Sequence, residues 1–148
     1  MIALACDHGA LTLKEHLKTY LERKGISCKD FGTNDAESCD YPDFVAPAAQ
    51  AVASGECEAG IVLCTTGIGA SIAANKIKGI RCALCHETYS AEMTRRHNNA
   101  NVLALGAGVT GTNLAERIVD VFLSTEFEGG RHQRRIDKVM ALETVEKG

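Results

Sequence analysis

Tryptophan is absent from this chain of 148 residues, and aromatic residues make up only 5% of it. That scarcity argues against a stacking surface for single-stranded nucleic acid. Basic residues are not in excess, since the formal net charge is -3, so nothing indicates binding to DNA or to an anionic membrane. No apolar run approaches the roughly 18 residues that a membrane-spanning helix needs. The first residues also lack the basic and apolar regions of a secretory signal.

The remaining composition is that of an ordinary globular protein, with 45% hydrophobic and 24% charged residues. The length suits one domain, which we expect to span residues 1–148. Seven cysteines are many for such a chain. Their odd number and irregular spacing, without a secretory segment, predict reduced thiols and a cytoplasmic location.

Short apolar runs alternate with longer amphipathic segments along the chain, which predicts βαβ units and a parallel sheet. Strands are expected at 2–6, 26–31, 60–64, 80–85 and 102–105, and helices through 13–21, 42–54, 72–74, 88–96, 112–122 and 131–145. In the helix through 112–122, Thr110 or Thr112 is expected as the cap, and Leu114, Ile118, Val121 and Phe122 as the apolar face. Right-handed crossovers then give a three-layer αβα sandwich. The fold class is a doubly wound five-stranded parallel sheet of the Rossmann or flavodoxin-like type with a C-terminal helix.

Ligands of such sheets bind beyond the carboxyl ends of the strands, where the strand order reverses. With a flavodoxin-like order 2-1-3-4-5, this crevice lies between the first and third strands. Asp7 and His8 follow the first strand, and residues 64–67 follow the third. The assumed order therefore brings two reactive segments together from distant parts of the chain.

Residues 63–71 are the most informative stretch, because a strand, a glycine-rich turn and a helix start follow one another there. Backbone N–H groups at a helix start can hold an anion. The positive end of the helix also favours the thiolate form of Cys64, which can then act as a base or a nucleophile. A small cysteine packed at a strand end is an equally good interpretation of these residues alone. Ala70 excludes the phosphatase-type Cys-x5-Arg loop, Ile72 leaves the dinucleotide fingerprint incomplete, and no Walker loop is present.

Three further polar groups are candidates for chemistry. Asp7 is either a helix cap or a site residue beside His8. His97 ends a helix, where its charged form is favoured and suits a general acid, although solvated polar helix ends are common. Arg131 and Arg135 share one face of the last helix and could grip a phosphate, or form a basic surface patch instead.

Cys82 and Cys85 have the C-x-x-C spacing but lie within an expected strand, and no second pair supports a zinc site. The other cysteines have no ligand-like spacing, and His16 is interpreted as structural. A redox protein built on Cys82 and Cys85 is therefore disfavoured.

Taken together, these stretches resemble the ribose/galactose isomerase family, which holds the type B ribose-5-phosphate isomerases and the galactose-6-phosphate isomerase subunits. The resemblance runs in order along nearly the whole chain. Its matching pieces are residues 6–8, 40–42, 64–76, 79–81, 96–98, 101–104, 128–133 and Arg135.

The resemblance implies an aldose–ketose isomerase of the pentose phosphate pathway, acting on ribose 5-phosphate through an enediolate, without metal or organic cofactor. It implies a homodimer or higher homo-oligomer with the active site at the subunit interface, and neither nucleic acid nor membrane as partner. The implied catalytic residues are the base Cys64, the ring-opening His97 and the proton-orienting Thr66. The implied substrate-binding residues are Asp7, His8, Tyr41, Thr65, Gly67, Ile68, Gly69, Asn98, Arg131 and Arg135.

Two positions depart from the family pattern. Thr65 stands where many members carry glycine, and Gly108 where many carry an arginine that reaches the phosphate. Ala70 stands where a branch of the family carries glutamate, so Cys64 is the base candidate of this loop. Two alternatives stay open: a hexose-6-phosphate isomerase acting on galactose or allose 6-phosphate, and a non-catalytic sugar-phosphate-binding module.

Overall fold

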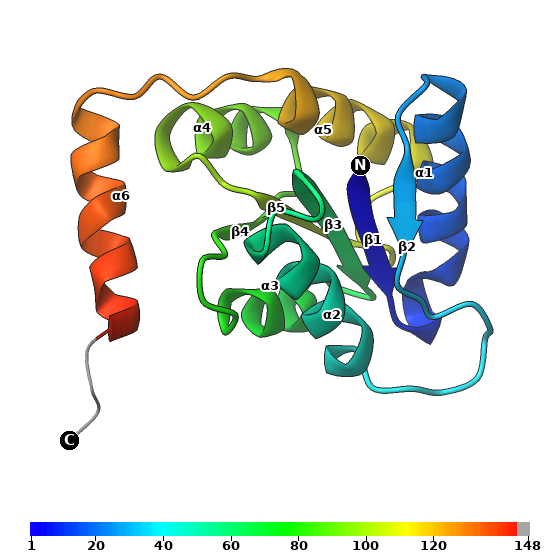
Figure 1. Cartoon of the computed structure of the whole chain (residues 1–148). Helices are drawn as coiled ribbons and strands as arrows, with labels where there is room; N and C mark the ends of the chain where they lie inside the picture. Colours follow the sequence, from blue (N-terminus) through cyan, green and yellow to red (C-terminus); the bar gives the residue numbers. More distant parts are fainter. Residues whose placement is uncertain (145–148) are drawn as a thin grey trace.

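The computed structural model describes residues 1–144, which form three layers around a parallel sheet (Figure 1). The strands lie in the order β2-β1-β3-β5-β4. Their bounds are Ile2–Cys6 (β1), Cys28–Asp30 (β2), Ala59–Cys64 (β3), Cys82–Leu84 (β4) and Val102–Gly106 (β5). The predicted fold class is confirmed.

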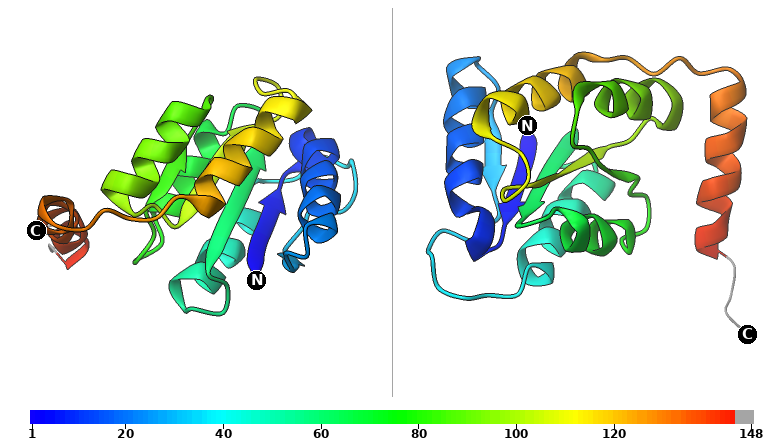
Figure 2. Two further views of the ribbon diagram at one scale, coloured as in Figure 1. Left: turned by 90° about the horizontal axis from the view of Figure 1, so that it is seen from above. Right: turned by 180° about the vertical axis from the view of Figure 1, so that it is seen from behind.

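Helices cover both faces of the sheet (Figures 1 and 2). Helices α1, α4 and α5 pack on one face, and α2 and α3 on the other. The helix bounds are Leu11–Arg23 (α1), Pro42–Ala53 (α2), Ile68–Asn75 (α3), Thr88–Asn98 (α4), Thr112–Ser124 (α5) and Arg131–Ala141 (α6), with short 3-10 turns at His8–Ala10 (η1) and Leu142–Thr144 (η2). Helix α6 lies outside the sandwich beyond α4, at the end of an extended segment. Over residues 1–144, no helix is long and apolar enough to cross a membrane.

The two faces of the sheet differ in side-chain size. In β1, Ile2 and Leu4 pack toward α1 and α5, whereas Ala3 and Ala5 pack toward α2. Gly60 of β3 continues the small face, because a Cβ there would lie 3.1 Å from a methyl group of Val52. Strand alternation therefore places a thick apolar layer on one face and lets α2 approach the other closely.

The assumed order of the last two strands was wrong, because β5 lies between β3 and β4. Burial explains this order. Every residue of β5 is buried, as an interior parallel strand requires, whereas the three residues of β4 are only partly buried and suit a sheet edge. The predicted reversal of order between β1 and β3 is confirmed.

Several element ends also differ from the prediction. The strands expected at 26–31 and 80–85 are shorter, at Cys28–Asp30 and Cys82–Leu84. Helix α5 has Gly111 at its N-cap and no side-chain cap, so neither Thr110 nor Thr112 caps it as expected. Leu114 is 40% exposed, and Ala115 and Val119 belong to the buried face instead. The last helix ends at Ala141, and residue 145, its expected end, lies outside the described residues.

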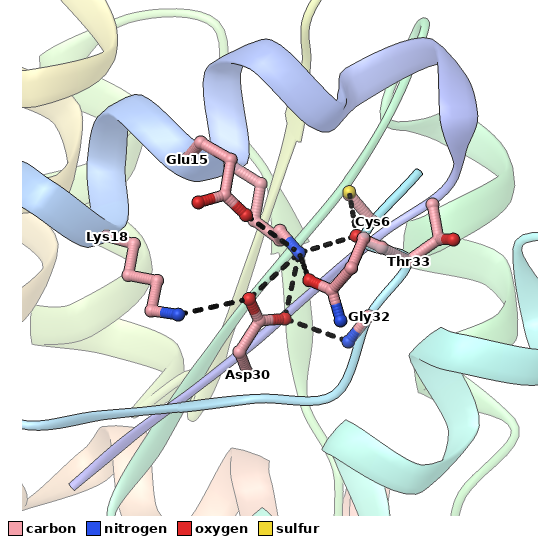
Figure 3. A network of polar contacts seen from close by, with 8 residues as sticks. Cys6, Glu15, Lys18, Asp30, Gly32 and Thr33 are labelled. Carbon is pink, nitrogen blue, oxygen red and sulfur yellow. Dashed lines mark hydrogen bonds and ion pairs between the residues drawn. The ribbon is translucent and has the colours of Figure 1, made fainter. Parts of the chain in front are cut away.

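Lys14, a buried lysine of α1, connects that helix to the end of β2 and to the segment after it. Figure 3 shows the polar network, with Asp30, Gly32 and Thr33 labelled. The Lys14 side chain has no exposed surface, and its Nζ donates to both carboxylate oxygens of Asp30, at 2.8 and 2.9 Å. It also donates to the Thr33 carbonyl at 2.6 Å and to Asn34 Oδ1 at 2.9 Å. Leu17 and Leu21, both buried, follow Lys14 at i+3 and i+7 on the same face of α1. This spacing could have predicted that Lys14 is buried.

This network holds the chain beside the end of β1. Cys6 N–H donates to the Gly32 carbonyl and Thr33 N–H donates to the Cys6 carbonyl, both at 2.7 Å. The segment that follows leads to Tyr41, at the start of α2. Lys14 therefore anchors the loop that borders the carboxyl end of β1.

Replacing Lys14 by Met leaves the Asp30 carboxylate, with only 11% of its side chain exposed, without its main partner. We expect the free energy of unfolding in urea to fall by about 3–5 kcal/mol. The control is Lys29→Met, which removes an exposed contact to Glu56 and should cost less than about 1 kcal/mol. Equal effects of the two substitutions would contradict the anchoring role.

The same pair predicts a dependence of stability on pH. Burial raises the pKa of Asp30, but the hydrogen bonds from Lys14 and from Gly32 N–H outweigh it and hold the pKa below its usual value. The stabilisation is complete above the pKa of an unfolded aspartate, about 4, and is lost as the pH falls through the lower folded value. Urea titrations at several acidic pH values should show this loss in the wild type and less of it in Lys14→Met.

Candidate active site

The carboxyl ends of β1 and β3 lie side by side. Cys6 pairs with Leu63, and Asp7 N–H donates to the Leu63 carbonyl at 3.3 Å. Cys64 pairs with Gly106 of β5 on its other side. The structure therefore brings together the two segments that the sequence predicted to converge.

Cys64 is 6% exposed and lies under the start of α3. Its Sγ accepts a hydrogen bond from Gly67 N–H at 3.2 Å. Gly67 adopts a left-handed conformation, with φ 78°, and a Cβ there would lie 2.8 Å from the Leu105 carbonyl carbon. Only glycine fits this turn, and the turn aims a backbone N–H donor at the Cys64 sulfur.

Two backbone N–H groups of the turn already donate hydrogen bonds within it. Ile68 N–H donates to the Thr66 hydroxyl at 3.2 Å, and Gly67 N–H is directed at Cys64. The first helical N–H groups have no carbonyl partner one turn back, so that of Gly69, which is only partly buried, remains for a ligand.

Asp7 and His8 form the side of the site opposite the Cys64 turn. Asp7 is 8% exposed, and its Oδ1 accepts a hydrogen bond from Gly9 N–H at 3.0 Å, so the capping interpretation of Asp7 is confirmed. The exposed His8 accepts a hydrogen bond from Cys39 N–H on Nδ1 at 3.2 Å, which connects the loop before α2 to this wall. Tyr41 completes the rim, because a Cβ on Gly69 would lie 2.5 Å from its ring.

The two departures from the family pattern contact each other. A Cβ on Gly108 would lie 3.1 Å from the Thr65 methyl group. The Thr65 hydroxyl lies on the other side against Gly9, where a Cβ would collide with it. Thr65 thus fills the space between the turn after β1 and the turn after β5, and both glycines accommodate it.

We call residues 64–69 with Asp7, His8 and Tyr41 the Cys64 cluster, and a second group lies apart from it. His97 and Asn98 end α4, and Arg131 and Arg135 face them from α6. All four line a cavity of about 860 Å³ between α6 and the sandwich, whereas Arg134 does not. We call these four residues the His97 cluster, and the shared face predicted for Arg131 and Arg135 is confirmed.

The two clusters lie at opposite ends of the parallel strands. The His97 cluster lies near the beginning of β5, because α4 ends at Asn98 and β5 starts at Val102. Cys64 pairs with Gly106, at the end of the same strand. Four strand steps separate these ends by about 13 Å. One copy of the chain therefore does not bring His97 to Cys64.

The remaining cysteines carry no comparable surroundings. Burial raises the pKa of Cys6 and Cys85 to about 11 and that of Cys82 to about 12. Cys82 lies in β4, as predicted, and all seven cysteines are free. His16 pairs with Glu116 at 2.6 Å, which supports its structural interpretation.

Sequence reasoning missed three polar residues near the His97 cluster. Arg81 donates to the carbonyls of Asn98 and Asn99, at 2.9 and 2.8 Å, and so caps α4. Glu128 and His132 flank His97. Glu128 and His132 have the i, i+4 spacing at which side chains meet, but no spacing signals their meeting with His97, which lies on another helix.

The fold and the Cys64 cluster define a doubly wound α/β protein with a candidate ligand site at its topological switch point. The family model described as Ribose/Galactose Isomerase matches residues 2–139. Ribose-5-phosphate isomerase B of Escherichia coli strain K12 is 47% identical over 142 residues, which cover 96% of this chain and 95% of that protein. The chain belongs to the ribose/galactose isomerase family.

Solved structures agree. Ribose-5-phosphate isomerase B from Clostridium thermocellum is 51% identical, with a TM-score of 0.95 over 96% of each chain. The enzyme from Mycoplasma genitalium, with bound ribulose-5-phosphate, is 41% identical, with a TM-score of 0.94 over 98% of this chain and 97% of that one.

The surroundings of the thiols predict their order of alkylation. At pH 8 we expect Cys64 to react with iodoacetamide at least about 10-fold faster than Cys85, because burial raises the pKa of Cys85 to about 11, whereas the Cys64 sulfur accepts a hydrogen bond from Gly67 N–H. Peptide mass spectrometry after short exposures measures both rates in one sample. Equal rates at the two cysteines would show that the turn does not activate Cys64.

Proposed function

We propose that this chain interconverts ribose 5-phosphate and ribulose 5-phosphate. The observation that carries the proposal is the Cys64 thiol, held under the start of α3 and opposite Asp7, in a chain of the ribose/galactose isomerase family. A module that only binds sugar phosphate needs no such thiol. The match to relatives that bear the name ribose-5-phosphate isomerase B supports the choice of substrate.

The proposed reaction moves one proton between neighbouring carbons. The proton on C2 of the open-chain aldose passes to Sγ of Cys64, and its electron pair forms the C1–C2 double bond of an enediolate. Cys64 returns the proton to C1, while the hydroxyl proton on O2 moves to O1, a transfer that Thr66 orients. The free N–H group at the start of α3 stabilises the negative oxygen, which develops only during the reaction.

The other proposed contacts hold the sugar. Asp7, His8 and Tyr41 line the pocket, together with Thr65 and the backbone of residues 67–69. Asn98 contacts the substrate, and Arg131 with Arg135 binds its phosphate through guanidinium hydrogen bonds. His97 donates a proton to the ring oxygen of the furanose form, which opens the ring before the isomerisation begins.

We propose that a second copy of the chain supplies the His97 cluster to the Cys64 cluster. The opposite placement of the two clusters supports this arrangement, since it leaves each incomplete alone. Exposed apolar side chains near both clusters offer surface for a homodimer: Ile68 and Ile72 on α3, and Val139 on α6. Ile136, also on α6, is buried within its own chain and offers no such surface.

Removing the thiol tests the base. Cys64→Ser should keep the fold but lose about 100-fold or more of the exchange of the substrate C2 proton with solvent, because a serine alkoxide is much less accessible than a thiolate. Proton NMR in heavy water, with ribose 5-phosphate and no added metal, follows both exchange and conversion. The matched control is Cys28→Ser, which removes a half-buried thiol outside the site. Wild-type exchange in Cys64→Ser would refute the assignment.

Mixing two inactive variants tests the shared site. Cys64→Ser and His97→Asn homodimers each lack one half of both sites. In a mixed dimer one site carries both defects and the other carries neither. After equilibration of equal amounts, half of the dimers are mixed, so we expect recovery of about a quarter of wild-type activity. Absence of recovery in verified mixed dimers would contradict a site that combines Cys64 of one copy with His97 of the other.

Two alternatives are decided by the same assay. A hexose-6-phosphate isomerase would show a higher kcat/KM on galactose or allose 6-phosphate than on ribose 5-phosphate. A binding module would bind the sugar phosphates without converting them. The contact between Thr65 and Gly108 at the site makes sugar length worth measuring directly.

A further inference from the structure

His97 is stacked on a second histidine. The rings of His97 and His132 lie 4.2 Å apart between centroids and 11° from parallel. His132 is the second residue of α6, whereas His97 lies at the end of α4. Glu128, in the segment that precedes α6, lies beside both rings: its carboxylate oxygens are 3.6 Å from His132 Nε2 and 4.0 Å from His97 Nε2.

The two histidines differ in exposure. The His132 side chain is 8% exposed, and its Nε2 is buried without a hydrogen-bond partner among the described residues. The His97 side chain is 41% exposed and lines the cavity under α6. Burying an imidazole nitrogen without a partner costs stability, so its retention needs an explanation. An explanation is that the His132 ring supports the neighbouring His97 ring by stacking on it.

Arginine side chains surround the stacked histidines. Arg96 of α4 faces it across Glu128, at 3.6 Å from that carboxylate, and Arg131 and Arg135 face it from α6. Burial, followed by the charges of His97 and Arg131, lowers the pKa of His132, so His132 stays neutral at neutral pH. His132 is therefore the neutral, buried ring against which the exposed His97 stacks.

The same charges argue against a metal at this point. The ligand atoms of His97, Glu128 and His132 lie within 4.8 Å of one another. However, the arginine side chains around them repel a cation, and they suit the approach of a phosphate.

We propose that His132 is a positioning residue for ring opening: its ring stacks on His97 and fixes the plane of that imidazole. This inference rests on the proposed function. In the step it serves, the C1–O4 bond of the furanose breaks, O4 takes the proton from His97, and the anomeric hydroxyl gives its proton to water. His132 touches neither the sugar nor the proton.

The test compares a ring substrate with an open-chain one. Ribose 5-phosphate is mainly a furanose. Ribulose 5-phosphate stays open, because the hydroxyl that would close a five-membered ring on its C2 carries the phosphate. We expect His132→Ala to lower kcat/KM on ribose 5-phosphate by roughly 10- to 100-fold. Exchange of the C1 protons of ribulose 5-phosphate with heavy water should fall much less, so the ratio of the two rates changes.

Two variants separate positioning from loss of structure. His132→Phe keeps a flat ring behind His97, so it should recover most of the ring-opening rate that His132→Ala loses. Ile136→Ala removes another buried side chain of α6, one turn further on, and should affect both substrates in parallel. The inference is overturned if His132→Ala affects both substrates equally, or if His132→Phe, folded by circular dichroism, is as defective as His132→Ala.

His97→Asn distinguishes the two levels of the proposal. If the wild type converts neither sugar, the proposed function fails. If His97→Asn impairs both substrates alike, the ring-opening role of His97 fails. If His97→Asn impairs only the ring substrate and His132→Ala impairs neither, the proposed function stands and the role of His132 is overturned.

Discussion

The parallel pairing of β1 with β3 is the constraint on which the rest of the structure depends. These strands are neighbours at the point where the strand order reverses, and their hydrogen bonds continue one residue beyond β1, from Asp7 N–H to the Leu63 carbonyl. The crossovers on either side run to opposite faces of the sheet, so helices leave the crevice open above the strand ends. Asp7 and Cys64 border this crevice because backbone pairing places them there, before any side chain interacts.

Close backbone approach then shapes the crevice. Gly67 lies against the end of β5, and Thr65 fills the space between Gly9 and Gly108. The Lys14 network also shapes the crevice, because it holds the segment after β2 beside the end of β1. The loop to Tyr41 begins at this segment. The Cys64 cluster is thus a rigid turn packed between two other turns, which suits donors that must be in place before charge develops.

The second half of the proposed site follows a different logic. The His97 cluster lies where α4 ends and α6 begins. Helix α4 packs on the sheet, whereas α6 lies outside the sandwich. A helix that follows a parallel strand runs back to the opposite edge of the sheet, so the end of α4 lies far from the carboxyl end of β3. Chain direction alone therefore separates the proposed base from the proposed acid, and association of two copies is the simplest way to unite them. An appended α6 that carries the two arginines proposed to bind phosphate fits that task.

Much of the fold and half of the candidate site could be predicted from the sequence. Apolar runs and helical periodicity determined the α/β class, and the glycine-rich turn after an apolar strand singled out Cys64, because local chemistry decides such features. Only the tertiary structure decided the order of β4 and β5, since a three-residue strand carries too little pattern to show which one lies at the edge. The tertiary structure also decided the burial of Lys14 and the stacking of His132 on His97, for these contacts join elements whose separation in sequence says nothing about their distance in space.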